Sequence, residues 1–248
     1  MNTEKEFNEY YSNIISINIV DINKYKDWYL KYFNFYILPF LPKKKQIKIL
    51  ELGCGWGINI HCLKENGYLN ITGVDISQEQ LQRAKEFLGI DNLVLQDIIE
   101  YLENNNNIYD LILIIDVIEH LEINDAIKLI KLAKLRLTLD GMMVISLPNS
   151  FSPFNPNFHR DITHKTSWTP QKISQLLKMA NFDNFKIYPL GIVPHGFISS
   201  IRYFLWNTII KNCIRLFLYI CYGDDLGGIY TPNILAVVYH NGKKNSSN

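Results

Sequence analysis

The segment from Ile47 to Asp75, IKILELGCGWGINIHCLKENGYLNITGVD, constrains the fold of this chain more than any other segment. Its apolar residues alternate with polar ones up to Leu52, which is the pattern of a strand. A glycine-rich turn follows, and then a helical pattern that stops near Gly67. A second strand, from Ile71 to Val74, leads to Asp75. Strand, helix and strand in this order predict a βαβ unit and hence an α/β protein with a parallel sheet.

The turn after the first strand predicts a nucleoside ligand. It contains three closely spaced glycines: Gly53, Gly55 and Gly57. Glycines let the backbone approach a ligand, and the next helix offers unpaired N–H groups. The dinucleotide fingerprint G-x-G-x-x-G would need a glycine where this chain has Ile58. Glu51, just before the turn, suits a ligand with a cationic amine, and Asp75 can accept both hydroxyls of a ribose. Together these features predict S-adenosylmethionine (SAM).

The sequence ILELGCGWG followed by VDIS resembles motif I and the ribose-binding acid of class I SAM-dependent methyltransferases. The resemblance implies a Rossmann-like, doubly wound sheet of seven mostly parallel strands, with the last strand antiparallel. It also implies that Asp97, after a third strand from Leu93 to Leu95, bonds the adenine amino group. A helix cap is the alternative for Asp97. The predicted cofactor-binding residues are Glu51, Gly53, Cys54, Gly55, Gly57, Asp75, Ile76, Asp97, Ile98 and Asp116.

A continuous apolar strand from Leu111 to Ile115 ends in the sequence DVIEHL, which resembles the fourth-strand motif of the same family. Open α/β sheets bind ligands at the carboxyl ends of their strands. Asp116 and His120 are therefore expected to border the methyl-sulfonium end of the cofactor. A packed histidine bonded to a backbone carbonyl is the alternative for His120.

Capping signals predict the helices around this motif. Asn124 is expected to begin the next helix, and Asp140-Gly141 to close it. Thr169 and Pro170 are expected to begin a later helix.

Two further segments carry a narrower resemblance: NSFSPFNPNFHRDITHKTSWTP and the later GGIYTPN. Both are similar to methyltransferases encoded among bacterial surface-polysaccharide (capsule and O-antigen) genes. That resemblance implies O-methylation of a sugar, or of a phosphate-type or acid group, on a polysaccharide or its nucleotide-linked precursor. N-methylation of an amino sugar and a non-catalytic, cofactor-binding partner subunit are the alternatives.

A hydroxyl acceptor must lose its proton as it is methylated, and a histidine with a carboxylate partner commonly serves as the base. The sequence predicts His120 or His164 as this base and Asp161 as the orienting partner. Arg160 is expected to hold an anionic substrate group bidentately. The predicted substrate-binding residues are Asn149, His159, Arg160 and His195.

A metal site is the alternative for the RDITH segment. His159, Asp161 and His164 place two imidazoles and a carboxylate within six residues. Since no cysteine or further acid nearby completes a site, the segment is interpreted as a hydrogen-bonding surface and no metal is expected.

The chain divides into three predicted parts. Residues 1–45, rich in aromatic side chains, are expected to form an N-terminal helical lid, with a pair of amphipathic helices packed on the core as the alternative. Residues 46–190 and 233–240 form the SAM-binding core, and residues 191–232 an apolar helical insertion. Within the insertion, positions 197–222 include Arg202, Lys211 and Arg215, so no uncharged run approaches the roughly 20 residues of a membrane span. A homodimer interface or a cap is favoured for this segment, with peripheral membrane contact as the alternative.

The composition fits a cytoplasmic enzyme acting on a small-molecule or saccharide substrate. Lys and Arg number 25 against 24 Asp and Glu, so no strong field favours nucleic acid. The N-terminus MNTEKEFNEY does not resemble a secretory signal. Without a C-x-x-C pair, neither a structural zinc nor a disulfide framework is expected, which fits a reducing compartment. The cysteines concerned are Cys54, Cys62, Cys213 and Cys221.

Overall fold

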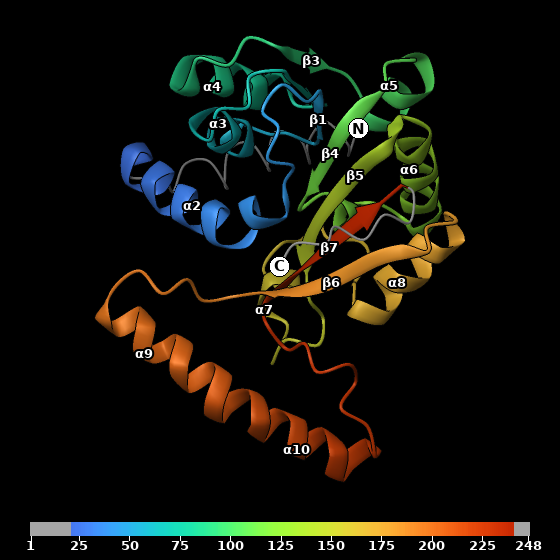
Figure 1. Ribbon diagram of the computed structural model, residues 1–248. Helices are drawn as coiled ribbons and strands as arrows, with labels where there is room; N and C mark the ends of the chain where they lie inside the picture. Colours follow the sequence, from blue (N-terminus) through green and yellow to red (C-terminus); the bar gives the residue numbers. More distant parts are fainter. Residues whose placement is uncertain (1–20, 241–248) are drawn as a thin grey trace.

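A single seven-stranded sheet organises the computed structural model, which describes residues 21–240 (Figure 1). The strand order is β3-β2-β1-β4-β5-β7-β6. All neighbouring strands up to β5 pair in parallel, and β7 runs antiparallel to both β5 and β6. The strands are β1 (Ile49–Leu52), β2 (Ile71–Asp75), β3 (Leu93–Leu95), β4 (Tyr109–Ile115), β5 (Leu137–Pro148), β6 (Asn184–Leu190) and β7 (Asn233–Tyr239). The predicted doubly wound sheet with an antiparallel last strand is confirmed.

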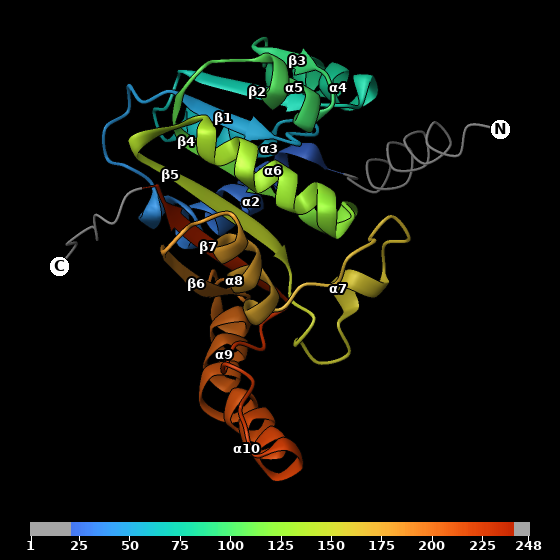
Figure 2. The same cartoon turned by 90° about the vertical axis from the view of Figure 1, so that its right-hand side faces the viewer.

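Helices cover both faces of the sheet, as Figures 1 and 2 show. Helices α2, α3 and α4 contribute to one hydrophobic core, and α5, α6 and α8 to the other. The helices are α2 (Ile22–Tyr36), α3 (Ile58–Glu65), α4 (Gln78–Leu88), α5 (Ile98–Asn104), α6 (Ile123–Leu135), α7 (Pro156–His159), α8 (Pro170–Met179), α9 (Phe197–Leu205) and α10 (Lys211–Tyr222), with short 3-10 turns η1 (Leu38–Phe40) and η2 (Ile118–His120). Because the strand order reverses between β1 and β4, a crevice for ligands is expected beyond their carboxyl ends.

Side chains cap the backbone at the starts of α4 and α8, and the predicted helix start at Thr169-Pro170 is confirmed. Ser77 accepts a hydrogen bond from the backbone N–H of Gln80 at the start of α4. Thr169 accepts one from Lys172 at the start of α8, with Pro170 as the first helical residue. Each cap satisfies a backbone donor that has no partner within the helix.

The prediction for the ends of α6 was wrong. The helix begins at Ile123, so Asn124 lies inside its first turn and not at its cap. Asp140-Gly141 does not close the helix either, because α6 ends at Leu135 and β5 already begins at Leu137. Leu137 pairs with Tyr109, and the register shifts before the next pair, Leu111 with Met142. Asp140-Gly141 therefore lies in an irregularity within strand β5.

Helices α9 and α10 join through a π-helical turn, η3 (Trp206–Ile210), into one long helix that projects away from the sheet (Figure 1). By length and composition this helix, Phe197–Tyr222, could cross a membrane, and its most apolar stretch is not buried. Its large apolar side chains are exposed along its length, for example Phe197, Phe204, Phe217 and Ile220. The predicted absence of a membrane span and the three-part division of the chain remain predictions. Residues 1–20 of the predicted lid lie outside the described chain.

Candidate active site

The glycine turn leaves an open backbone surface at the end of β1. Gly53 has a φ of +70°, and a Cβ on it would lie 2.5 Å from a methyl of Val117. Gly55 also has a positive φ, +51°, but a Cβ there would meet no atom within 4 Å. A side chain at Gly53 would therefore collide with the protein, whereas one at Gly55 would occupy the space beside the turn.

Asp75 is fixed beside that turn by two backbone donors. The N–H of Gly55 donates to its Oδ2 at 2.7 Å, and the N–H of Ser77 donates to its Oδ1 at 2.8 Å. Burial raises the pKa of Asp75, while these N–H groups act in the opposite direction. The carboxylate is thus positioned before any ligand arrives, as a ribose-binding acid should be.

Asp97 caps helix α5. Its Oδ1 accepts the backbone N–H groups of Ile99 at 2.8 Å and Glu100 at 3.0 Å. This is the capping role that was the alternative for Asp97. These bonds use only Oδ1, so the adenine contact through the other oxygen remains a prediction.

Glu51 is a buried carboxylate at the end of β1, with an exposed fraction of 0%. Its Oε1 accepts the side-chain amide of Asn59 at 2.7 Å, and Asn59 in turn accepts the hydroxyl of Tyr29 at 2.8 Å. Its Oε2 is buried without a hydrogen-bond partner. Burial raises the pKa of Glu51 to about 8, against the lowering effect of the Asn59 bond. An unpartnered buried carboxylate oxygen is costly unless a donor arrives, and the ammonium of SAM is such a donor. With the open space at Gly55 and the fixed Asp75, the residues present fit SAM.

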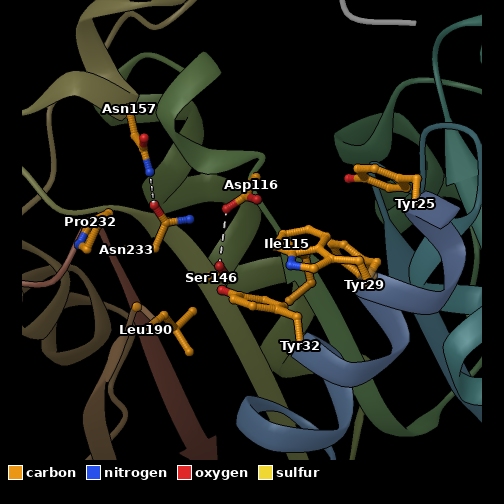
Figure 3. A pocket seen from close by; sticks show the side chains of 12 residues that line it. Tyr25, Tyr29, Tyr32, Ile115, Asp116, Ser146, Asn157, Leu190, Pro232 and Asn233 are labelled. Atoms are coloured by element: carbon orange, nitrogen blue, oxygen red, sulfur yellow. Dashed lines mark hydrogen bonds between the residues drawn. The ribbon is translucent and has the colours of Figure 1, made fainter. Parts of the chain in front are cut away.

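A cavity of about 300 Å³ opens beyond the carboxyl ends of β4 and β5 (Figure 3). Aromatic side chains of α2 form one wall, and polar groups face them from the sheet. Ser146 donates to Asp116 Oδ1 at 3.1 Å, and Asn157 donates to the side-chain oxygen of Asn233 at 2.6 Å. The principal side chains of the walls are those of Tyr25, Trp28, Tyr29, Tyr32, Asp116, Ser146, Asn157 and Asn233.

Asp116 sits in this cavity in an unusual backbone conformation, with a φ of +53°. Its carboxylate is open to the cavity but surrounded by protein, and this partial desolvation raises the pKa of Asp116. The hydroxyl of Ser146 and the nearby His164 oppose the rise. Backbone strain of this kind is commonly found at ligand-binding sites.

A hydrogen-bonded relay orients His120. The hydroxyl of Thr163 donates to Asp161 Oδ1 at 2.6 Å, and the same oxygen of Thr163 lies 2.8 Å from His120 Nδ1. Because the single hydroxyl proton of Thr163 goes to Asp161, Nδ1 of His120 must be the donor in the second bond. The lone pair of a neutral His120 is therefore on Nε2. Burial, and secondly the neighbouring His164, lower the pKa of His120 to about 4.

His164 packs against His120, with ring centroids 4.7 Å apart. Its Nδ1 lies 3.1 Å from the backbone carbonyl oxygen of Phe158, so Nδ1 carries the proton there as well. Its Nε2 lies 3.9 Å from Asp161 Oδ2 and 4.0 Å from Glu119 Oε1. Glu119 is buried, and burial followed by the nearby Asp116 raises the pKa of Glu119 well above its usual range. The structure thus brings together His120, Asp161 and His164, the three residues predicted to be catalytic.

The four predicted substrate-binding residues lie in different surroundings from one another. Asn149 is completely buried and donates to the carbonyls of Ile229 and Thr231, so it ties the loop after β5 to the GGIYTPN segment. Its contact with a substrate remains a prediction. His159 and Arg160 are exposed at the end of α7. His195 lies before α9, where its Nδ1 is 2.9 Å from the carbonyl oxygen of Val193.

Several residues of the site were not assigned from the sequence. Glu119 and Asn233 lie inside segments whose resemblance was noted, so a signal for them existed. Asn157 and Thr163 lie in such a segment as well, whereas Ser146 had no such signal, because its partner Asp116 lies 30 positions away along the chain.

Comparison with known proteins agrees with this geometry. Residues 25–187, more than half of the chain, match the protein family described as "Methyltransferase domain". A 59-residue segment is 39% identical to the cyclopropane-fatty-acyl-phospholipid synthase of Escherichia coli (strain K12). This segment covers 23% of the present chain and 15% of the synthase, so the similarity is local.

Solved structures share the fold. A SAM-dependent methyltransferase from Archaeoglobus fulgidus superimposes with a TM-score of 0.64 at 23% identity, covering 86% of this chain and 94% of the other. Phosphoethanolamine N-methyltransferase 2 from Haemonchus contortus, in complex with SAM, gives a TM-score of 0.58 at 19% identity, covering 83% of this chain and 51% of the other.

Proposed function

Because the chain belongs to the methyltransferase-domain family and is a SAM-dependent methyltransferase, we propose that it methylates a hydroxyl group of a saccharide. The observation that carries this proposal is the cavity, which Asp116 lines, together with the oriented histidine pair, whose His164 acts electrostatically on Asp116. Amide, hydroxyl and carboxylate groups on one wall can pair with sugar hydroxyls, while the tyrosines of α2 offer flat apolar faces.

Different residues of the site have different roles in methyl transfer. When bound, SAM supplies a methyl group already activated by its sulfonium. Glu51, Asp75 and the glycine turn hold and orient that ligand, and the tyrosines of α2 keep water from the cavity. The acceptor oxygen forms its bond to the methyl carbon as the carbon–sulfur bond breaks, with the electron pair staying on sulfur. The cluster of His120, Asp161 and His164 takes up the proton of the acceptor hydroxyl.

The saccharide is proposed to belong to a capsule or another surface polysaccharide, or to its nucleotide-linked precursor. The RDITH and GGIYTPN segments support this, since their resemblance is to methyltransferases of such gene clusters. An anionic group on the precursor could reach the exposed guanidinium of Arg160. A nucleotide-linked acceptor would place the enzyme in the cytoplasm.

One observation favours a second candidate function, N-methylation of an amino sugar. Asp116 presents a carboxylate to the cavity, which suits a cationic amine as well as a hydroxyl. The cationic amine must lose a proton before its lone pair can attack, but an ammonium is far more acidic than a hydroxyl, so its methylation depends less on the histidines.

Separate His120→Ala and His164→Ala variants, assayed with SAM and nucleotide-linked sugars, test the proposal. We expect at least a roughly hundredfold fall in turnover for O-methylation, with calorimetric affinity for SAM unchanged. If both variants keep near-normal turnover while still binding SAM, the histidine pair does not handle the acceptor proton. Methylation of amino sugars only would favour the second candidate.

For the projecting helix Phe197–Tyr222 we propose a contact surface, either with a second copy of the chain or with a membrane. Its exposed apolar side chains support this, because such a large apolar surface is rarely left uncovered. Light scattering after size-exclusion chromatography, and flotation with liposomes, distinguish the two. A strict monomer that does not bind liposomes would exclude both.

A further inference from the structure

Glu119, His120 and His164 form a cluster of potential metal ligands close to Asp116, a residue that lines the cavity. One ligand atom from each residue lies within 4.8 Å of the others. This set differs from the one considered in the sequence, which included His159. His159 is exposed in the structure, whereas Glu119 comes from the DVIEHL motif, much earlier in the chain.

The surroundings of Glu119 favour the binding of a cation. The residue is 1% exposed, and neither of its carboxylate oxygens has a hydrogen-bond partner. A buried carboxylate without partners is strongly disfavoured, so a structural role in the protein alone does not explain it. Asp116 and Asp161 add further negative charge nearby.

The contacts around the two histidines match those of metal ligands. Histidines that bind metals usually donate the other ring N–H to a protein oxygen, which fixes the tautomer. His164 directs Nδ1 to the carbonyl of Phe158, and His120 directs Nδ1 to Thr163, which is itself held by Asp161. In both rings Nε2 therefore carries the lone pair.

The spacing within the cluster suits an ion better than direct contacts. His164 Nε2 is 4.0 Å from Glu119 Oε1 and 3.9 Å from Asp161 Oδ2, too far for hydrogen bonds. Two ligand atoms of one ion, each at about 2.0–2.2 Å, are separated by at most about 4.4 Å. The distances of His164 fall within that limit, and any pair of the cluster as far apart as 4.8 Å must close by about 0.4 Å when an ion binds.

We propose that Glu119, His120 and His164 bind a single divalent ion of the first transition row, such as Mn²⁺, Co²⁺ or Zn²⁺, with the carboxylate of Asp161 nearby, 3.9 Å from His164 Nε2. Imidazole nitrogen combined with carboxylate oxygen is a ligand set that these ions accept. Three protein ligands leave a coordination position open toward a substrate.

The role of the ion rests on the proposed function, although its binding does not. An acceptor hydroxyl on the open position would become more acidic. Its proton would pass to solvent as the oxygen takes the methyl group, and the two histidines would serve as ligands instead of a free base.

Titration of the metal-stripped, full-length protein with Mn²⁺, followed by electron paramagnetic resonance and calorimetry, tests the site. We expect one ion per chain. Glu119→Gln and His164→Asn should each weaken binding at least tenfold, and the outer-shell variant Thr163→Val about 10–100-fold. His61→Ala is the matched control, because His61 lies on α3, away from the cluster, and should bind as the wild type does.

Circular dichroism and SAM affinity show whether each variant is folded. Wild-type protein that binds none of Mn²⁺, Co²⁺ and Zn²⁺ below millimolar concentration would overturn the proposal, as would a folded Glu119→Gln variant with wild-type affinity. Since the titration needs no acceptor, it can succeed even if the enzyme fails to methylate any saccharide. Undiminished O-methylation by metal-stripped enzyme would overturn the catalytic role of the ion.

Discussion

The cofactor side and the acceptor side of the site are built in different ways. On the cofactor side the contacts are local: Gly55 reaches Asp75 across 20 positions and Asn59 reaches Glu51 across 8. On the acceptor side they are distant: His120 meets Thr163 across 43 positions, and Asn157 meets Asn233 across 76. A contact within one βαβ unit is set by local geometry, whereas a contact between loops depends on the whole fold. Substitutions on the cofactor side should therefore alter SAM binding, and substitutions on the acceptor side should alter turnover.

The largest expected effect is that of Gly55→Leu on the cofactor side. A leucine there must adopt a positive φ, at a cost of about 1–2 kcal/mol, and fills the open space beside the turn. We expect SAM affinity to fall more than a hundredfold in calorimetry.

Gly89→Leu is the matched control for Gly55→Leu. Gly89 has a φ of +59°, and a Cβ on it would likewise meet no atom within 4 Å, but this glycine ends helix α4. The variant should suffer the same loss of stability with normal SAM affinity. Equal losses of affinity in the two variants would mean that the turn is strained but does not hold the ligand.

The cofactor side and the acceptor side also differ in how far they could be predicted from the sequence. The glycine turn, Glu51 and Asp75 were predicted as cofactor-binding from their spacing and residue type, because a strand, a turn and a helix in succession fix their relative positions. The hydrogen bonds of Asn149 were not predicted, because only the folded chain reveals that the GGIYTPN segment occupies both of its amide hydrogens. Likewise, strand β6 was not located, since its half-buried edge residues give little periodic signal.

On the acceptor side, Thr163→Val removes the hydroxyl between His120 and Asp161 while keeping the shape of the side chain. The histidine would lose the partner that fixes its tautomer. Steady-state kinetics should show a fall in turnover of about 10–100-fold. SAM affinity should not change, and a fall in that affinity alone would break the division between the two sides.

Glu51→Gln is expected to weaken SAM binding about tenfold, since an amide cannot form the charge-assisted bond to an ammonium. The same substitution should alter stability in the opposite direction. Burial raises the pKa of Glu51 to about 8 from about 4.5, so its protonated form is favoured by folding. The unliganded wild type should therefore lose stability as the pH rises from about 4.5 to 8, by roughly 1.4 kcal/mol for each pH unit within that range.

The Glu51→Gln variant should lack this pH-dependent loss and melt at a higher temperature than the wild type at pH 8. Differential scanning calorimetry across pH 5–9, with and without SAM, measures both effects. A wild type and a variant with parallel pH profiles would show that Glu51 is not a buried, titrating carboxylate.

The smallest expected effect comes from Tyr29→Phe, which removes one hydroxyl at the boundary between the two sides. Tyr29 lines the cavity with its ring, while its hydroxyl donates to Asn59 and so supports Glu51. A hydrogen bond of this kind contributes about 0.5–1.5 kcal/mol, which corresponds to about two- to twelvefold in affinity. Because the hydroxyl acts on Glu51 only through Asn59, SAM affinity should fall by the lower part of that range, about two- to fivefold. Turnover at saturating SAM should stay near the wild-type value, because the ring that faces the acceptor is retained. A larger effect on turnover than on SAM affinity would mean that α2 couples the two sides, and that the cofactor and acceptor sites cannot be perturbed independently.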